Sequence, residues 1–145
     1  MMRILDPTLR QEATAVALPR AARPRSLGGA TIGLLANSKS NGMALLDRIV
    51  ERLRDRHQIG DVVRVSKTNA SAPVSESDAD LLAGRCAVVI TEPFEATAEA
   101  MAKLAGMAGY PYAVVPHPFG SLSPAEVSAR ADKVVDRIEQ LLLDN

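Results

Sequence analysis

Residues 86–120, CAVVITEPFEATAEAMAKLAGMAGYPYAVVPHPFG, place two short apolar runs on either side of an alanine-rich stretch. The runs Ala87–Ile90 and Ala113–Val115 are rich in β-branched side chains, which is typical of strands buried on both faces of a parallel sheet. Parallel neighbours need a long crossover connection, and the alanine-rich stretch predicts a helix in that place. These residues therefore predict a β-α-β unit, and with it the fold class.

The same alternation extends towards both ends of the chain. We expect strands over residues 30–36, 61–66, 86–90 and 112–115, and helices over about 42–56, 75–84, 94–105 and from 124 to the end. Ser123-Pro124-Ala125-Glu126 combines a capping serine, a proline at the first helical position and a glutamate two residues later. The order predicts a small doubly wound α/β domain, with a four-stranded parallel sheet of order 2-1-3-4 flanked by helices.

Residues 1–29 differ from the rest, because prolines at 7, 19 and 24 interrupt any periodicity. They form either a flexible tail or an ordered N-terminal arm that wraps a neighbour, and their short apolar runs favour the arm. Residues 30–145 are long enough to form a single α/β domain. The predicted sheet has open edges, which favour an oligomer.

The composition excludes several classes of protein. Lys plus Arg equals Asp plus Glu, at 17 each, and there is no tryptophan, so neither charge nor stacking side chains indicate a nucleic-acid partner. One cysteine excludes an intrachain disulfide and cannot form a metal site alone, and no motif indicates a cofactor. No apolar run approaches the ~20 residues of a membrane span. We expect a cytoplasmic protein that binds neither membrane nor nucleic acid.

The candidate site lies where the predicted strands end, because open α/β sheets bind ligands beyond the carboxyl ends of their strands. After the first strand, Asn37, Ser38, Lys39 and Asn41 combine amides, a hydroxyl and a cation near the start of a helix, which suits an anionic substrate. The alternative is that Ser40 or Asn41 only caps the helix.

Two further turns contribute candidate catalytic residues. Glu92 follows the third strand. It is either a general base or a carboxylate that only interacts favourably with the positive end of the helix dipole. His117 lies between Pro116 and Pro118 after the fourth strand, where the ring is available for acid–base chemistry or serves only the structure. The same turns contain further residues that we expect to contact substrate: Thr91, Phe94 and Phe119.

Several segments resemble the UGSC family, which is named for a selenocysteine- or cysteine-Gly-Ser-Cys motif. The matching segments are residues 4–7, 31–35 with Asn37, 91–94, 115–118 and 122–127. The resemblance implies a thiol- or selenol-dependent protein, distantly similar to the substrate-handling subunits of glycine reductase.

The chain departs from that family at its centre. It contains no Cys-Gly-Ser-Cys, and residues 86–90 continue straight into 91–94, where the family has a further strand and helix. Compared with the family pattern that the resemblance implies, we expect about one strand–helix unit to be missing, on the scale of the ~30 residues of a β-α-β repeat. Cys86 begins its strand, away from the candidate site, and a redox exchange needs a second thiol. We therefore expect a small buried Cys86 and no thiol redox chemistry by this chain alone.

Three functions stay open on the sequence. The first is a non-redox subunit of a hetero-oligomeric enzyme, in which a partner such as a longer UGSC chain completes the sheet and a small-molecule site. The second is a self-sufficient lyase or hydrolase that uses His117 and Glu92. The third is a ligand-binding module without catalysis. The shortened sheet, its open edges and the N-terminal arm favour the first.

Overall fold

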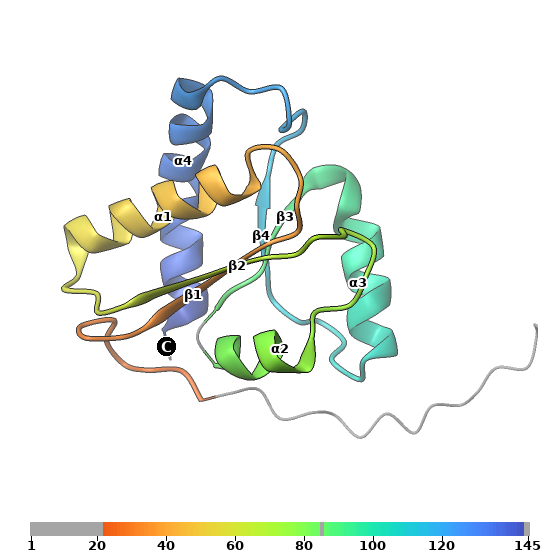
Figure 1. Cartoon of the computed structure of the whole chain (residues 1–145), viewed down its shortest axis with the longest axis horizontal. Helices are drawn as coiled ribbons and strands as arrows, with labels where there is room; N and C mark the ends of the chain where they lie inside the picture. The colour runs from red at the N-terminus through yellow and green to blue at the C-terminus, as the bar shows by residue number, and fades with distance from the viewer. Residues whose placement is uncertain (1–21, 85, 144–145) are drawn as a thin grey trace, which may run out of the picture.

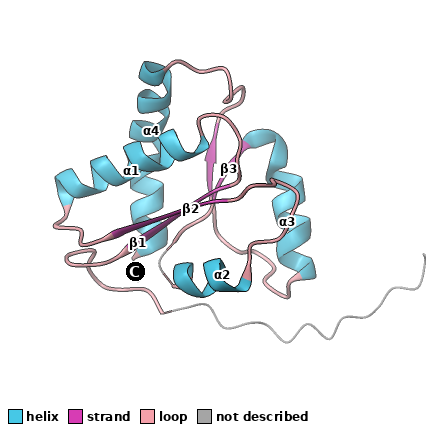
Figure 2. Ribbon diagram, viewed as in Figure 1, coloured by secondary structure: helices cyan, strands magenta, loops and turns pink. Residues whose placement is uncertain are grey.

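Strands and helices alternate along the chain as the sequence predicts. The computed structural model describes residues 22–84 and 86–143. Its elements are β1 (Ile32–Ala36), α1 (Gly42–Arg56), β2 (Val62–Ser66), α2 (Glu76–Leu82), β3 (Val89–Thr91), the 3-10 turn η1 (Glu92–Phe94), α3 (Glu95–Leu104), β4 (Ala113–Val115) and α4 (Pro124–Leu142). The protein is therefore a mixed α/β fold (Figures 1 and 2).

The strands form two separate parallel pairs. β1 pairs with β2, from Ile32 opposite Val62 to Ala36 opposite Ser66, and β3 pairs with β4, from Val89 opposite Ala113 onwards. The expected single sheet of order 2-1-3-4 is not formed, because no ladder joins β1 to β3 in the described part of the chain. In Figure 2, β1 and β2 run across the direction of β3 and β4, and strands that diverge in this way cannot share a continuous ladder.

The core lies mainly between α1, α4 and the strands. Figure 1 shows α1 crossing α4. The buried face of α1 is Leu45, Ile49, Val50 and Leu53, and α4 buries Val127, Ala131, Val134, Val135, Ile138 and Leu142. By contrast, α3 has no buried residue. One half of the protein is therefore well packed, and the half containing β3 and α3 is open.

Salt bridges border the packed contact between α1 and α4. Arg52 Nε lies 2.5 Å from Asp132 Oδ1, and Arg56 bonds Asp136 and Glu139 at 2.6 and 2.8 Å. The hydrogen bond from Arg52 holds the pKa of Asp132 below its ordinary value. All of these groups are solvent-accessible, so each pair adds little stability and mainly fixes the register of the two helices.

The start of α4 confirms the capping motif in the sequence. The Ser123 hydroxyl accepts the Glu126 N–H at 3.4 Å, and the Glu126 carboxylate accepts the Ser123 N–H at 2.8 Å. Pro124 occupies the first turn. Hydrogen bonds from Ser123 lower the pKa of Glu126, which keeps this carboxylate ionised at the positive end of the helix.

The expected N-terminal arm, residues 1–29, is described only from residue 22. Within that part, Leu27 is 1% exposed and belongs to the hydrophobic core. Arg23 donates a hydrogen bond to the Cys86 carbonyl at 3.1 Å, close to the start of β3. These residues therefore pack against the domain. Within the described ranges, no helix combines the length and the apolar character needed to cross a bilayer.

Gly60 is a position where a side chain does not fit. It donates its N–H to the Ala30 carbonyl at 3.0 Å, and a Cβ there would lie 2.7 Å from the carbonyl oxygen of Gly29. Because the clashing atom is backbone, Gly60→Ala is expected to lower the free energy of unfolding by about 1–3 kcal/mol. Urea unfolding followed by circular dichroism measures this change.

Gly28→Ala is the matched control for that substitution. A Cβ at Gly28 would lie 3.4 Å from the Ser26 hydroxyl, an ordinary contact with a side chain. Its unfolding midpoint should stay close to that of the unsubstituted protein. Equal midpoints for the two variants would contradict the close approach of Gly60 to the 29–30 turn.

Candidate functional site

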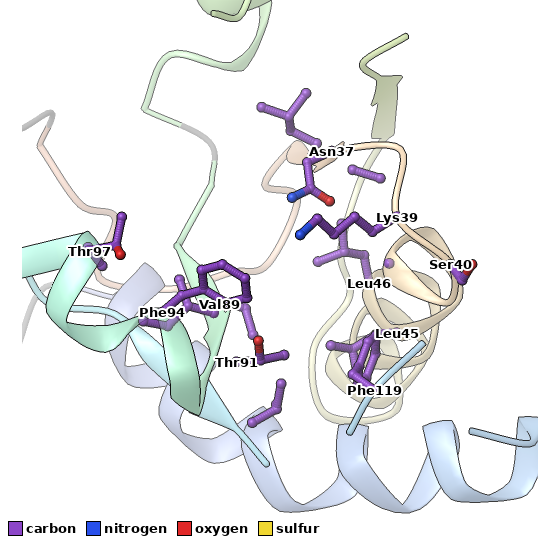
Figure 3. A pocket seen from close by; sticks show the side chains of 16 residues that line it. Asn37, Lys39, Ser40, Leu45, Leu46, Val89, Thr91, Phe94, Thr97 and Phe119 are labelled. Atoms are coloured by element: carbon purple, nitrogen blue, oxygen red, sulfur yellow. The ribbon is translucent and has the colours of Figure 1, made fainter. Parts of the chain in front are cut away.

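The carboxyl ends of β1, β3 and β4 surround a cleft of about 410 Å³, within the usual size range of small-molecule sites. Side chains of β1, α1, β3, α3 and β4 form its walls. In Figure 3, the labelled side chains of residues 37–46 face those of residues 89–97 across the opening. The apolar lining is Leu35, Ala36, Leu45, Leu46, Val89, Ile90, Phe94, Ala98, Val115 and Phe119; the polar lining is Asn37, Lys39, Ser40, Thr91 and Thr97.

Lys39 and Phe94 lie on opposite sides of this opening. The Lys39 ammonium is 4.8 Å from the centre of the Phe94 ring, within the range of a cation–π contact, and Figure 3 shows the two side chains directed towards each other. Both residues are exposed, so the contact is readily exchanged for another partner. Among the described residues that line the cleft, Lys39 is the one ionisable side chain.

The Asn41 side chain joins two loops and does not cap helix α1. It stands at the N-cap position of α1, but its side chain makes no capping hydrogen bond. Its Nδ2 donates instead to the carbonyls of Phe119, Gly120 and Leu122, at 3.0, 3.3 and 3.0 Å. Asn41 therefore fixes the loop between β4 and α4 against the loop between β1 and α1. It does not line the cleft.

Ser38 has a left-handed backbone, with φ of 65°, which is uncommon for serine. Its hydroxyl donates to the carbonyl of its neighbour Asn37 at 2.5 Å and is exposed. Ser38 does not line the cleft, whereas Asn37 does. The Asn37 side chain therefore lines the cleft, while the Ser38 hydroxyl is hydrogen-bonded to the backbone of the same turn.

Glu92 and His117 come together, although their contact does not join two side chains. The backbone N–H of His117 donates to Glu92 Oε2 at 3.3 Å, so the two turns lie at the same end of the molecule. Both residues are exposed, and neither lines the cleft. In this geometry Glu92 fixes the turn after β4, which gives the carboxylate a structural task and leaves the imidazole outside the cleft.

The residues predicted from the sequence can be compared with the lining of this cleft. Of the nine predicted residues, the cleft is lined by Asn37, Lys39, Thr91, Phe94 and Phe119 and not by Ser38, Asn41, Glu92 or His117. Sequence reasoning missed Thr97 and Ala98. Helical spacing could have found them, because residues three and four positions after Phe94 share its face of a helix.

Cys86 lies three residues before β3, which begins at Val89 and not at residue 86 as the sequence predicted. Its thiol donates a long hydrogen bond to the Leu82 carbonyl, at 3.8 Å, and is partly buried. Burial raises the pKa of this thiol, and the nearby Arg23 lowers it by a smaller amount. Cys86 is therefore mostly protonated at neutral pH and is unsuited to nucleophilic chemistry.

Cys86 is expected to react with a maleimide or a disulfide reagent more slowly than free cysteine at pH 7.5. The thiolate is the reactive form, and a raised pKa reduces its fraction at this pH. The rate should increase as the pH rises towards the raised pKa. A reaction as fast as that of free cysteine in the folded protein would contradict the burial of this side chain.

Comparison with known proteins gives one result. The pattern of the UGSC family matches residues 3–91 and 86–144, which together cover nearly the whole chain. No match was found among curated proteins or among solved structures. The match agrees with the resemblance carried by the turns at 91–94 and 115–118. This chain belongs to the UGSC family.

Proposed function

We propose that this chain is a subunit of a hetero-oligomeric enzyme and contributes one part of a site for a small anionic molecule. The observation that carries the proposal is the cleft at the carboxyl ends of β1 and β3, with the Lys39 ammonium at its opening. Ligand sites of α/β proteins occur at such crevices, with mostly apolar walls and a few polar groups that fix orientation.

The chemistry of the cleft favours a ligand with an apolar body and one anionic group. Leu35, Leu46 and Ile90 offer apolar contact, and Lys39 offers a positive charge that only a weak aromatic contact occupies. The Asn37 amide and the Thr91 hydroxyl add neutral hydrogen-bonding groups at the same opening. A small carboxylate would satisfy these groups together.

The absence of an acid–base pair in the cleft supports a subunit over a self-sufficient lyase or hydrolase. General acid–base catalysis needs a group within about 3 Å of the reacting proton. In the part of the chain that the structure describes, the cleft offers only Lys39, since Glu92 and His117 lie outside it. A partner chain would supply the missing catalytic groups.

The proposed site is tested with phenylacetate and its neutral analogue phenylacetamide. In titrations of the ¹⁵N-labelled full-length chain, phenylacetate should shift the amide signals of residues 35–39 and 89–94, and phenylacetamide should bind more weakly. An ion pair at a partly exposed site contributes about 0.5–1 kcal/mol, so the expected difference in affinity is about two- to fivefold.

Two variants separate the role of Lys39 from a general effect of charge. Lys39→Met should remove the preference for phenylacetate over phenylacetamide. Lys133→Met, on the exposed face of α4, removes the same charge away from the cleft and should leave the preference unchanged. Equal binding of the two compounds to the unsubstituted chain, or a preference that survives Lys39→Met, would rule out the proposed anion site.

A further inference from the structure

A second cavity, of about 470 Å³, lies between α3, α4 and the connection from α3 to β4. This connection enters β4 at the amino end of the strand, whereas the cleft described above lies at the carboxyl ends (Figure 1). We call it the amino-end cavity. It has no lining residue in common with the cleft, so the two are separate places for a ligand.

One face of α3 forms the first wall of the amino-end cavity. Glu99, Ala102 and Lys103 line it, and residues three and four positions apart share one face of a helix. The spacing of Glu99 and Lys103 suits an ion pair, but the two side chains form none in the described part of the chain. The Lys103 ammonium is therefore available to a ligand.

Backbone hydrogen bonds fix the connection that forms the second wall. At the end of α3, Gly106 has a left-handed backbone, with φ of 72°, and the Met107 N–H donates to the Ala102 carbonyl at 2.8 Å. In the turn that follows, the Tyr110 N–H donates to the Met107 carbonyl at 3.0 Å, with Gly109 in the left-handed position. This wall is therefore in place before a ligand binds.

Tyr110 and Tyr112 give this wall two aromatic rings. Pro111 between them favours an extended backbone, in which alternate side chains lie on the same side, and both tyrosines line the cavity. Partial burial, with the nearby carboxylates of Glu99 and Glu95, raises the pKa of Tyr112, so its phenol stays protonated at neutral pH. Neutral aromatic rings of this kind stack on flat aromatic groups.

Arg137 of α4 completes the cavity with a second positive charge. Arg52 and Arg56, at the contact between α1 and α4, are held in salt bridges, whereas Arg137 forms no ion pair with another described residue. A guanidinium binds a phosphate through two parallel hydrogen bonds. Because Arg137 and Lys103 outnumber Glu99 among the charged lining residues, the cavity favours a ligand with more than one negative charge.

We propose that the amino-end cavity binds a phosphate monoester that carries a flat aromatic group, the chemistry of a nucleoside monophosphate. Arg137 and Lys103 bind the phosphate, the tyrosine rings stack on the aromatic group, and Glu99 accepts hydrogen bonds from N–H or O–H groups of the ligand. The volume lies within the usual range for a ligand of this size. The inference is independent of the proposed function, because it uses no residue of the cleft.

The probe for this test is adenosine monophosphate (AMP), compared with adenosine, which lacks the phosphate, and ribose phosphate, which lacks the base. In titrations of the ¹⁵N-labelled full-length chain, AMP should shift the amide signals of residues 99–103 and 109–112. AMP should bind about tenfold more tightly than adenosine, because charged hydrogen bonds hold the phosphate. It should bind about fivefold or more tightly than ribose phosphate, because the base stacks on tyrosine.

Two pairs of variants assign these contributions to side chains. Arg137→Gln should weaken AMP binding by about fivefold or more and leave adenosine binding unchanged. Arg54→Gln removes the same charge from an exposed position of α1 outside both cavities and should have no effect. Tyr112→Leu should weaken the binding of AMP and adenosine but not of ribose phosphate, whereas Tyr112→Phe retains the ring and should bind AMP normally.

Three outcomes would overturn the proposal. They are AMP-induced shifts that are absent from residues 99–103 and 109–112, adenosine that binds as tightly as AMP, and equal effects of Arg137→Gln and Arg54→Gln. Lys39→Met should leave AMP binding intact, because Lys39 lines only the cleft. Failure of AMP to bind, together with a Lys39-dependent preference for phenylacetate, would therefore reject this inference while the proposed anion site stands.

Discussion

Leu53→Ala is expected to lower the free energy of unfolding by about 2–5 kcal/mol. Leu53 is 1% exposed and belongs to the core cluster that α1 shares with α4. Removing its isobutyl group loses apolar burial and leaves a cavity that the surrounding helices close only in part. At about 2–4 °C for each kcal/mol in a domain of this size, the melting temperature should fall by roughly 5–20 °C.

Leu104→Ala provides the control, because it makes the same change on the last residue of α3. Leu104 is 74% exposed, and an exposed substitution of this kind should change stability by no more than about 0.5 kcal/mol. Thermal unfolding followed at 222 nm gives both values. Similar losses for the two variants would mean that the open half of the molecule contributes as much to stability as the α1–α4 core.

Asn41→Asp is expected to destabilise the protein by about 2–3 kcal/mol, although the two side chains have nearly the same shape. The Asn41 amide donates to the carbonyls of Phe119, Gly120 and Leu122, and a carboxylate would place a negative oxygen against these acceptors. The loop after β4 should then detach from the loop after β1. Urea unfolding measures the loss, and the amide signals of residues 119–122 should shift most.

Two substitutions separate the causes of this effect. Asn41→Gly retains access to the left-handed backbone, φ of 63°, and removes only the side-chain hydrogen bonds, so it should lose less stability than Asn41→Asp. Asn37→Asp introduces the same charge at an exposed residue of the same loop and should have a small effect. A large loss in Asn37→Asp would show that charge alone, and not the tie to residues 119–122, destabilises this loop.

The local features of the fold could be predicted from the sequence because their causes are local. The capping motif at Ser123 and the buried faces of α1 and α4 follow from neighbouring residues and from helical spacing. The parallel direction of β1 with β2 and of β3 with β4 follows from the alternation of strands and helices. The resemblance to the UGSC family, carried by short motifs, is confirmed by the family match.

The candidate site was predicted less completely, for a physical reason. The sequence places Lys39, Glu92 and His117 at the same edge, because strands that run in parallel end together. It does not predict which way a side chain turns. Lys39 reaches the cleft and contacts Phe94, while Glu92 bonds the His117 backbone outside it. The direction of each side chain depends on partners that are distant in sequence. The same holds for Asn41, whose amide bonds the backbone of residues 119–122.

By itself, the sequence determined the order of the elements, the family and the edge at which ligands are expected, since composition, periodicity and short motifs carry this information. Only the tertiary structure decided that the strands form two pairs with a cleft between β1 and β3. Strand pairing between β1 and β3 depends on the spacing and direction of whole elements. Periodicity marks a strand as buried but does not identify the strand that lies beside it.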